Sequence, residues 1–99
     1  MIIYEVNLKI CKKIYHDFYK WLISHQEQML TYNGFTKSEV FKVESGISDY
    51  NYLSVHYHIS NIESLNNYFT NHAVKMQNEG IKLFKINFSA ERRVLSKLD

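Results

Sequence analysis

The chain has 99 residues, of which 45% are hydrophobic and 15% aromatic, which is enough apolar material for one core but too short a chain for a second domain. Its 12 Lys and Arg nearly balance its 10 Asp and Glu, and the resulting charge of +2 is spread along the chain, which argues against nucleic acid and against a polybasic membrane anchor. The single cysteine, Cys11, excludes an internal disulfide, and neither a signal peptide nor an apolar run of roughly 18 residues is evident. We therefore predict one cytoplasmic domain, residues 1–99, with no nucleic acid and no membrane among its partners.

The first half of the chain predicts a strand, a helix and an edge strand. Residues 2–10 alternate between apolar and mixed side chains, which is typical of a strand with one core face. Residues 12–30 carry apolar side chains at helical spacing, and Asn33-Gly34 supplies the stop. Residues 35–44 alternate less cleanly and carry charges that discourage stray pairing at a sheet edge. One face of this strand is expected to carry Phe35, Lys37, Glu39, Phe41 and Val43.

A hairpin turn and a third strand follow. Gly46 and Ser48-Asp49 mark the turn. Residues 50–59 then alternate again, which predicts a strand with one apolar face and one polar, aromatic face. The polar face is expected to carry Tyr50, Tyr52, Ser54, His56 and His58.

A second helix and a last strand complete the chain. Ser60 and Glu63 are spaced as a capping box, and the helix that they begin is expected to end at Gly80. Residues 81–85 fit no single pattern. Residues 87–95 predict the last strand, because apolar and polar side chains alternate along it.

The two predicted helices contain the same phrase, once as Trp21-Leu22-x-x-His25-x-x-x-Met29 and once as Tyr68-Phe69-x-x-His72-x-x-x-Met76. A strand precedes and follows each phrase, which gives the order β-α-β-β-α-β. This order predicts a ferredoxin-like α+β sandwich: a four-stranded antiparallel sheet with both helices on one face, because right-handed crossovers place them on the same side. The first and third strands then occupy the middle of the sheet.

The face of the sheet away from the helices needs a cover. It is expected to carry a mixture of polar, charged and aromatic side chains, which an isolated domain would leave in solvent. The commonest solution is a second copy that packs sheet to sheet as a dimeric α/β barrel and closes a small cavity between the two sheets. We therefore predict a homodimer with a small-ligand-binding cavity on the open face.

Several short motifs resemble a known family. They are Met1-Ile2-Ile3-Tyr4-Glu5-Val6, the end of the first helix through Met29-Leu30 before Gly34-Phe35, the pair His72-Ala73, and Phe88-Ser89-Ala90-Glu91-Arg92-Arg93-Val94-Leu95. Together they resemble a small bacterial family of domains of unknown function, numbered 4286, over nearly the whole chain, although a proline that the family tends to carry after each helix histidine is Gln or Val here. The resemblance implies the shape of the dimeric α/β barrel proteins, which include cofactor-free monooxygenases, isomerases and stress-response proteins. It implies no assigned activity.

The first candidate site lies on the open sheet face. Glu5 should neighbour His56 or His58, because the first and third strands are adjacent, and a histidine beside a carboxylate is a general acid–base pair by type. Tyr52, Glu91 and Arg93 on the same face are candidate ligand-binding residues. The cluster Glu5, His56 and His58 could also ligate a metal, but it lacks a fourth ligand, and charged pairs across strands are ordinary sheet stabilisers. We predict neither a metal nor a cofactor.

The second candidate comprises His25 and His72, which lie on the apolar stripes of their helices near the C-terminal ends. A histidine there can donate to an unpaired helix-end carbonyl, and its repetition favours such a structural role. In dimeric barrel proteins, however, a histidine late in the first helix can line the cavity, so His25 stays a candidate catalytic residue by resemblance.

Cys11 and the arginine pair are weaker candidates. Cys11 lies beside two lysines that would lower the pKa of its thiol, but it has no resolving cysteine or evident base. Arg92 and Arg93 point to opposite faces of a strand and cannot grip one phosphate together. Alternation assigns Arg93 to the open face and Arg92 to the helix side.

Two functions follow from these patterns. The first is a small-molecule enzyme or ligand binder that uses the open face, and the alternative is a non-catalytic interaction module that uses the same face as its interface. An RNA-binding sheet is discounted, because the third strand lacks the Gly-aromatic-x-aromatic signature and the charge is too even.

Overall fold

The computed structural model describes residues 1–98 and has the predicted order of strands and helices. Its strands are β1 (Ile2–Cys11), β2 (Phe35–Lys42), β3 (Tyr50–Ile59) and β4 (Phe88–Ser96), and its helices are α1 (Tyr15–Met29), α2 (Ile62–Asn71) and α3 (Ala73–Phe84). Short 3₁₀ turns, Lys12–Ile14 and Lys85–Asn87, precede α1 and β4.

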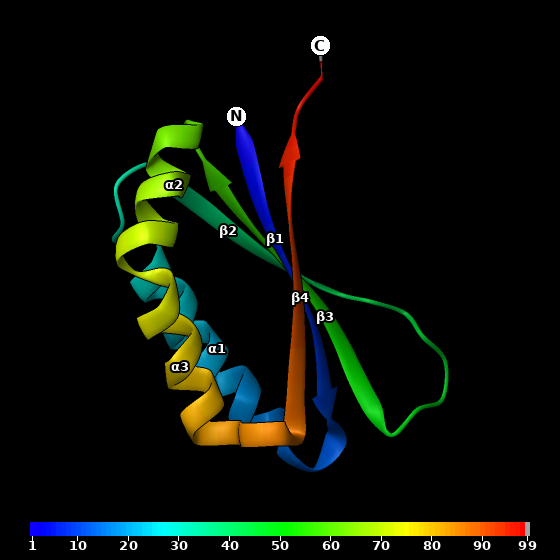
Figure 1. Cartoon of the computed structure of the whole chain (residues 1–99). Helices are drawn as coiled ribbons and strands as arrows, with labels where there is room; N and C mark the ends of the chain where they lie inside the picture. Colours follow the sequence, from blue (N-terminus) through cyan, green and yellow to red (C-terminus); the bar gives the residue numbers. More distant parts are fainter. Residues whose placement is uncertain (99) are drawn as a thin grey trace.

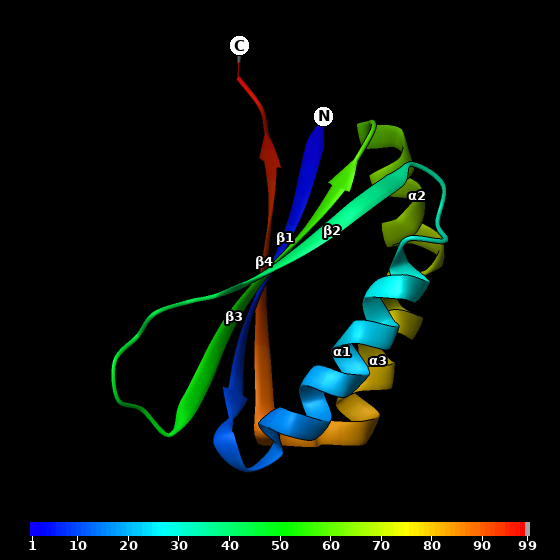
Figure 2. The same cartoon turned by 180° about the vertical axis from the view of Figure 1, so that it is seen from behind.

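The four strands form one antiparallel sheet in the order β2-β3-β1-β4, with β1 and β3 in the middle as predicted. All three helices lie on the same face of the twisted sheet (Figures 1 and 2). The ferredoxin-like α+β sandwich is therefore confirmed. Among residues 1–98, no helix has both the length and the apolar character needed to cross a membrane.

The second predicted helix is in fact two helices. His72 leaves helical geometry, with φ −132° and ψ −27°, and separates α2 from α3. Its ring stacks on Tyr32, with 4.2 Å between the ring centroids. The cap also differs from the prediction, because the side chain of Asn61, one residue after Ser60, accepts a hydrogen bond from the Ser64 amide at 2.8 Å.

Gly80 does not end the second helix. It is buried within α3, which continues to Phe84 and so includes most of the ambiguous residues 81–85. A Cβ atom at Gly80 would lie 2.9 Å from the Trp21 ring. Gly80 therefore serves close packing of α3 against α1, and the expectation of a helix stop is wrong.

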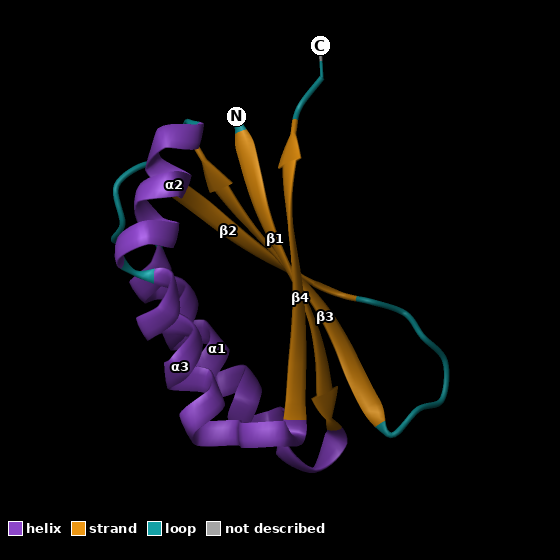
Figure 3. Cartoon of the chain, viewed as in Figure 1, coloured by secondary structure: helices purple, strands orange, loops and turns teal. Residues whose placement is uncertain are grey.

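A bulge in β2 changes the predicted faces of that strand. Phe35 pairs with Ile59 and Lys37 pairs with His58, so Thr36 is an extra residue between them. Because an extra residue reverses the alternation, Phe35 joins the buried core while Lys37 lies on the other face. The prediction that Phe35 shares a face with Lys37 and Glu39 is wrong for this reason. β2 also ends at Lys42, and the loop that follows extends away from the two layers (Figure 3).

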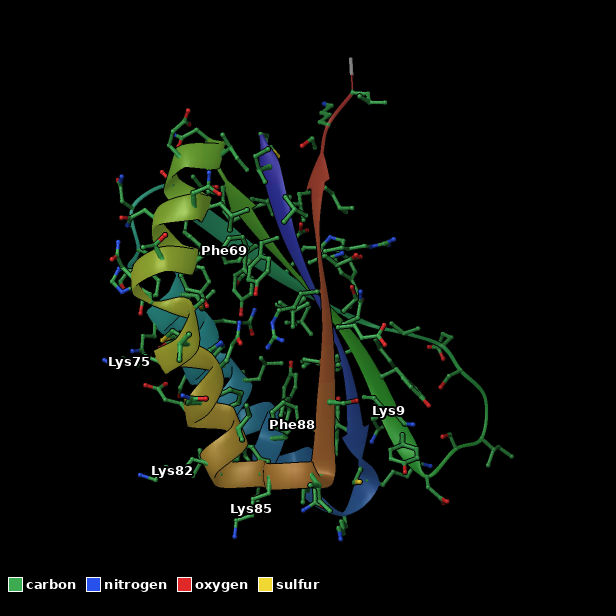
Figure 4. The ribbon with its side chains drawn as sticks, viewed as in Figure 1. Lys9, Phe69, Lys75, Lys82, Lys85 and Phe88 are labelled. Atoms are coloured by element: carbon green, nitrogen blue, oxygen red, sulfur yellow. The ribbon has the colours of Figure 1, made fainter. Side chains whose placement is uncertain are left out.

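The core fills the space between sheet and helices and is rich in aromatic rings. Its buried hydrophobic residues are Tyr4, Leu8, Ile10, Phe18, Leu22, Met29, Phe35, Leu53, Val55, Tyr57, Ile59, Leu65, Tyr68, Ala73 and Met76. Figure 4 shows Phe69 near one end of this space and Phe88 near the other. Large rings therefore occupy both ends of the space between the two layers.

Gly34 and Gly46 offer a test of how the chain turns. Both have positive φ, at +84° and +74°, but a Cβ atom at Gly34 would lie 2.3 Å from Ser64 Oγ, whereas one at Gly46 would meet nothing within 4 Å. Gly34→Ala should lower the free energy of unfolding by about 2 kcal/mol or more, because backbone strain and a clash add. Gly46→Ala should cost only about 1 kcal/mol of strain. Urea denaturation of both variants measures the difference, and equal losses would contradict the proposed clash.

Candidate functional site

The open face, meaning the sheet surface away from the helices, carries a pair of contacts centred on Glu5. The strand register places Glu5 opposite His56 on β3 and opposite Arg93 on β4. Glu5 Oε1 lies 3.2 Å from His56 Nε2, and Arg93 Nε donates to Glu5 Oε2. The hydrogen bond from Arg93 is the largest influence that lowers the pKa of Glu5. The carboxylate is therefore ionised and occupied by two partners.

His58 does not join this group. Its Nε2 atom lies 2.7 Å from Glu39 Oε1 on β2, so the open face holds two separate histidine–carboxylate pairs. The expected trio Glu5, His56 and His58 does not converge on one point. Within the described range, 1–98, no group of three or more His, Cys, Asp or Glu side chains is placed to hold a metal. Glu39 was not singled out from the sequence, because its register depends on the bulge at Thr36.

The remaining predicted residues of this face are more dispersed. Tyr52 pairs across the strands with Lys9 and is half-buried, while Glu91 pairs with Asn7 and is exposed. Phe41 contacts the His56 ring, with 5.1 Å between the centroids, yet is 46% exposed. The open face thus presents paired charges beside exposed apolar area.

A cavity lies on the other side of the sheet, between the sheet and the helices. Its volume is about 250 Å³. Residues from the strands β1, β3 and β4 and from the helices α1, α2 and α3 line it. The cavity is not lined by the six open-face side chains that the sequence analysis named as site candidates: Glu5, Tyr52, His56, His58, Glu91 and Arg93. The prediction placed the ligand cavity on the open face, whereas this cavity lies on the helix-covered face.

His25 lies in the wall of this cavity. Its ring stacks on Trp21, one helical turn earlier, with 4.6 Å between the centroids. Its Nδ1 atom is buried and has no hydrogen-bond partner among residues 1–98. Burial, followed by the charge of Arg92, lowers the pKa of His25 to about 4. The imidazole is therefore neutral near pH 7, with a ring nitrogen unused by the protein. His72 does not line the cavity.

Three tyrosines form a second part of the wall. Tyr4, Tyr57 and Tyr68 come from β1, β3 and α2, and the Tyr4 centroid lies 6.1 Å from that of Tyr57 and 5.9 Å from that of Tyr68. Burial raises the pKa of all three hydroxyls. The three phenols therefore stay protonated and can donate hydrogen bonds. Alternation had assigned Tyr4 to the core, and nothing in the sequence distinguishes a core tyrosine from one beside a cavity.

Arg92 and Arg93 differ in their partners. Alternation along β4 correctly places Arg93 on the open face, where Glu5 neutralises it. Arg92 lies on the helix side and lines the cavity. In the described part of the chain, no carboxylate is within salt-bridge distance of Arg92. The charge of Arg92 works against the rise that burial causes in the pKa of Tyr4. The alternation of side chains along β4, which assigned Arg92 to the helix side, could have indicated it as a site residue.

His25 should make stability depend on pH. Its pKa of about 4 lies below the ordinary 6.5, so between these values the unfolded chain binds a proton that the folded chain does not. The free energy of unfolding should therefore fall by roughly 1 kcal/mol per pH unit as the pH drops from 6.5 towards 4. Urea denaturation across this range should show a flatter profile for His25→Gln. His16→Gln, which removes an exposed histidine from the same helix, should keep the original slope, and an unchanged slope in His25→Gln would refute the assignment.

Glu5 should add a second pH dependence of the same sign, at lower pH than that of His25. Because its pKa is lowered in the folded state, its contribution is complete above the ordinary value of 4.5 and is lost as the pH falls through the lowered value. Glu5→Gln should cost about 1–3 kcal/mol at pH 7, since Arg93 and His56 lose a charged acceptor. Thermal denaturation at pH 7 and below pH 4 measures the cost, which should shrink at the lower pH.

Comparison with known proteins supports the fold and the family. A family model described as "Domain of unknown function (DUF4286)" matches residues 1–98. A search of curated proteins found no match. A candidate antibiotic biosynthesis monooxygenase from Deinococcus radiodurans superposes with a TM-score of 0.76 at 11% identity, covering 100% of this chain and 94% of that one. A mutant of SnoaB, a cofactor-independent oxygenase from Streptomyces nogalater, gives 0.70 at 8%, covering 99% and 94%. An EthD family protein from Bacillus halodurans gives 0.69 at 14%, covering 99% and 100%. These likenesses confirm the fold type of the dimeric α/β barrels.

Proposed function

We propose that this chain, which belongs to the family DUF4286, is a small-ligand-binding protein whose site is the cavity between its sheet and its helices. The cavity itself carries the proposal. Small-molecule sites are concave, mostly apolar, and carry a few convergent polar groups, and this cavity combines aromatic walls with His25, Arg92 and three tyrosine hydroxyls. At identities of 8–14% the likeness to these solved structures shows the fold alone, so this chain's own residues support the binding of a ligand.

The unused nitrogen of His25 supports the same function. A buried polar atom without a partner costs free energy, and such atoms are rare in folded proteins. A ligand that fills the cavity can supply the missing hydrogen bond to Nδ1. The stack on Trp21 meanwhile fixes the orientation of the ring, so that the nitrogen is presented rather than mobile.

We further propose that two copies associate through the open face as a homodimer. Phe41 and Val43 expose 46% and 43% of their surface at the β2 edge of this face, beside the charge pairs of Glu5 and Glu39. Apolar area next to the paired charges of Glu5 and Glu39 is suited to burial against a second sheet, because these two carboxylates already have partners.

The alternative function is a non-catalytic interaction module that uses the open face alone. The exposed Phe41 is the observation that favours it. If this alternative is right, a substitution that fills the cavity leaves the function of the protein unchanged. If the protein binds a ligand in the cavity, the same substitution removes that binding.

A cavity-filling variant distinguishes these functions. Ala90 lines the cavity. Val94 lies four residues further along β4, on the same face of the strand, but does not line the cavity. Native mass spectrometry of protein purified from cells should show a dimer that carries a non-covalent small molecule. Ala90→Leu should lose that added mass and remain a dimer, while Val94→Leu should keep both.

Other results would contradict the proposal. Retention of the same added mass by Ala90→Leu would place the ligand outside the cavity. A wild-type dimer without added mass, together with unchanged thermal stability in Ala90→Leu, would favour the interaction module. A strict monomer at micromolar concentration would overturn the proposed dimer.

A further inference from the structure

We propose that the ligand of this cavity is a compact organic anion, a carboxylate or a similar oxyanion on a flat apolar body, and that Arg92 binds its charge. This inference rests on the proposed function and adds the chemical class of the ligand. It follows from the charges of the lining, from the position of Arg92, and from the size and character of the walls.

The lining has a cation but no anion. Among the twenty described residues that line the cavity there is no Asp and no Glu. Arg92 and Lys85 are present, but Figure 4 shows the amino group of Lys85 pointing away from the space between the layers. Arg93, the neighbour of Arg92, already has Glu5 as its partner. Arg92 is therefore the charge at this cavity that lacks a counter-charge within residues 1–98.

Arg92 acts on polar groups from four different elements. Its charge favours the ionised forms of Tyr4, Tyr57 and Tyr68 and disfavours protonation of His25. These groups come from β1, β3, α2 and α1, and all of them line the same cavity as Arg92. Arg92 is also exposed, and a ligand that arrives from solvent can reach it.

The polar groups around Arg92 are donors. The raised pKa values keep the hydroxyls of Tyr4, Tyr57 and Tyr68 protonated, and a neutral His25 carries one ring proton. An oxyanion accepts hydrogen bonds only, and guanidinium matches a carboxylate with two parallel hydrogen bonds. A cationic ligand would face Arg92 and would find no carboxylate in the described lining. The arrangement therefore selects negative charge.

The walls define the rest of the ligand. Phe18, Trp21 and Phe88 line the cavity and pack on one another, with 5.5 Å between the first two centroids and 5.0 Å between Phe18 and Phe88. Flat rings of this kind favour a planar apolar partner. The volume of about 250 Å³ is slightly below that of typical small-molecule sites, which are roughly 300–1,000 Å³. A ligand with a single ring fits this description, and free inorganic phosphate does not use the apolar walls.

The test uses two matched probes, benzoate and its neutral isostere benzamide, with inorganic phosphate as a third. Titration of ¹⁵N-labelled protein, followed by NMR, reports both affinity and location. Benzoate should bind with shifts of residues around the cavity, and benzamide should bind at least about tenfold more weakly, since a charge-assisted hydrogen bond is lost. Arg92→Met should weaken benzoate binding by about tenfold or more and leave benzamide unaffected.

Two control variants make the outcome specific. Lys82→Met removes one positive charge from α3, where the amino group points to solvent (Figure 4), and should leave benzoate affinity unchanged. Ala90→Leu should abolish the binding of both probes, because it fills the cavity. Arg92→Lys should recover part of the affinity for benzoate, since it restores charge without the planar pair of donors.

The outcomes separate this inference from the function on which it rests. Equal binding of benzoate and benzamide, with both lost in Ala90→Leu, would overturn the anionic ligand while the cavity remained the site. Benzoate shifts confined to the open face around Glu5 would overturn the cavity as the site. Phosphate binding as strong as that of benzoate and insensitive to Ala90→Leu would show a surface ion only, and no saturable binding of either organic probe would also refute the inference.

Discussion

The antiparallel pairing of β1 with β3 and β4 is the constraint on which the rest of the structure depends. A strand sends successive side chains to opposite faces, so Tyr4 and Glu5 of the same strand belong to different environments. The pairing with β4 extends this separation, because Arg93 lies opposite Glu5 while Arg92 lies opposite Val6. One register therefore assigns one arginine to a carboxylate on the open face and the other to the cavity.

The two faces of the sheet solve the problem of burying polar groups in different ways. On the open face, Glu5 is only 5% exposed and is satisfied by Arg93 and His56, and His58 is satisfied by Glu39. At the cavity, Nδ1 of His25 lacks a partner and Arg92 lacks a counter-charge among the described residues. A satisfied network stabilises a sheet or an interface, whereas unsatisfied groups beside a hollow are suited to a ligand. This contrast, rather than the mere presence of histidines and carboxylates, distinguishes the two candidate sites.

The cavity lies between aromatic rings of the two layers, and a glycine lets two of the helices approach each other. Aromatic side chains from both layers pack edge to face, as Tyr4 does with Phe69 at an interplanar angle of 84°. Aromatic pairs prefer such edge-to-face arrangements to full face-to-face contact. Gly80 meanwhile lets α3 approach Trp21, which keeps that ring, and through it His25, in place. Packing of large residues and the absence of one side chain thus act together.

The sequence by itself determined the order of the elements, the central place of β1 and β3, and the place of Glu5 beside a β3 histidine on the open face, because these follow from period-2 alternation and from the rule for right-handed crossovers. It left open whether His56 or His58 is the partner of Glu5, and the strand register decided for His56 and placed Arg93 opposite Glu5. The sequence also determined that Arg92 faces the helices. Only the tertiary structure decided that His58 pairs with Glu39, since that register depends on a bulge. It also decided that the helix-covered side contains a cavity, because a cavity results from how side chains of several elements pack together and has no pattern within any one segment. Tyr4 and Tyr57 belong to apolar strand faces in the sequence, and together with Tyr68 they become hydrogen-bond donors at a site only through the space that lies between them.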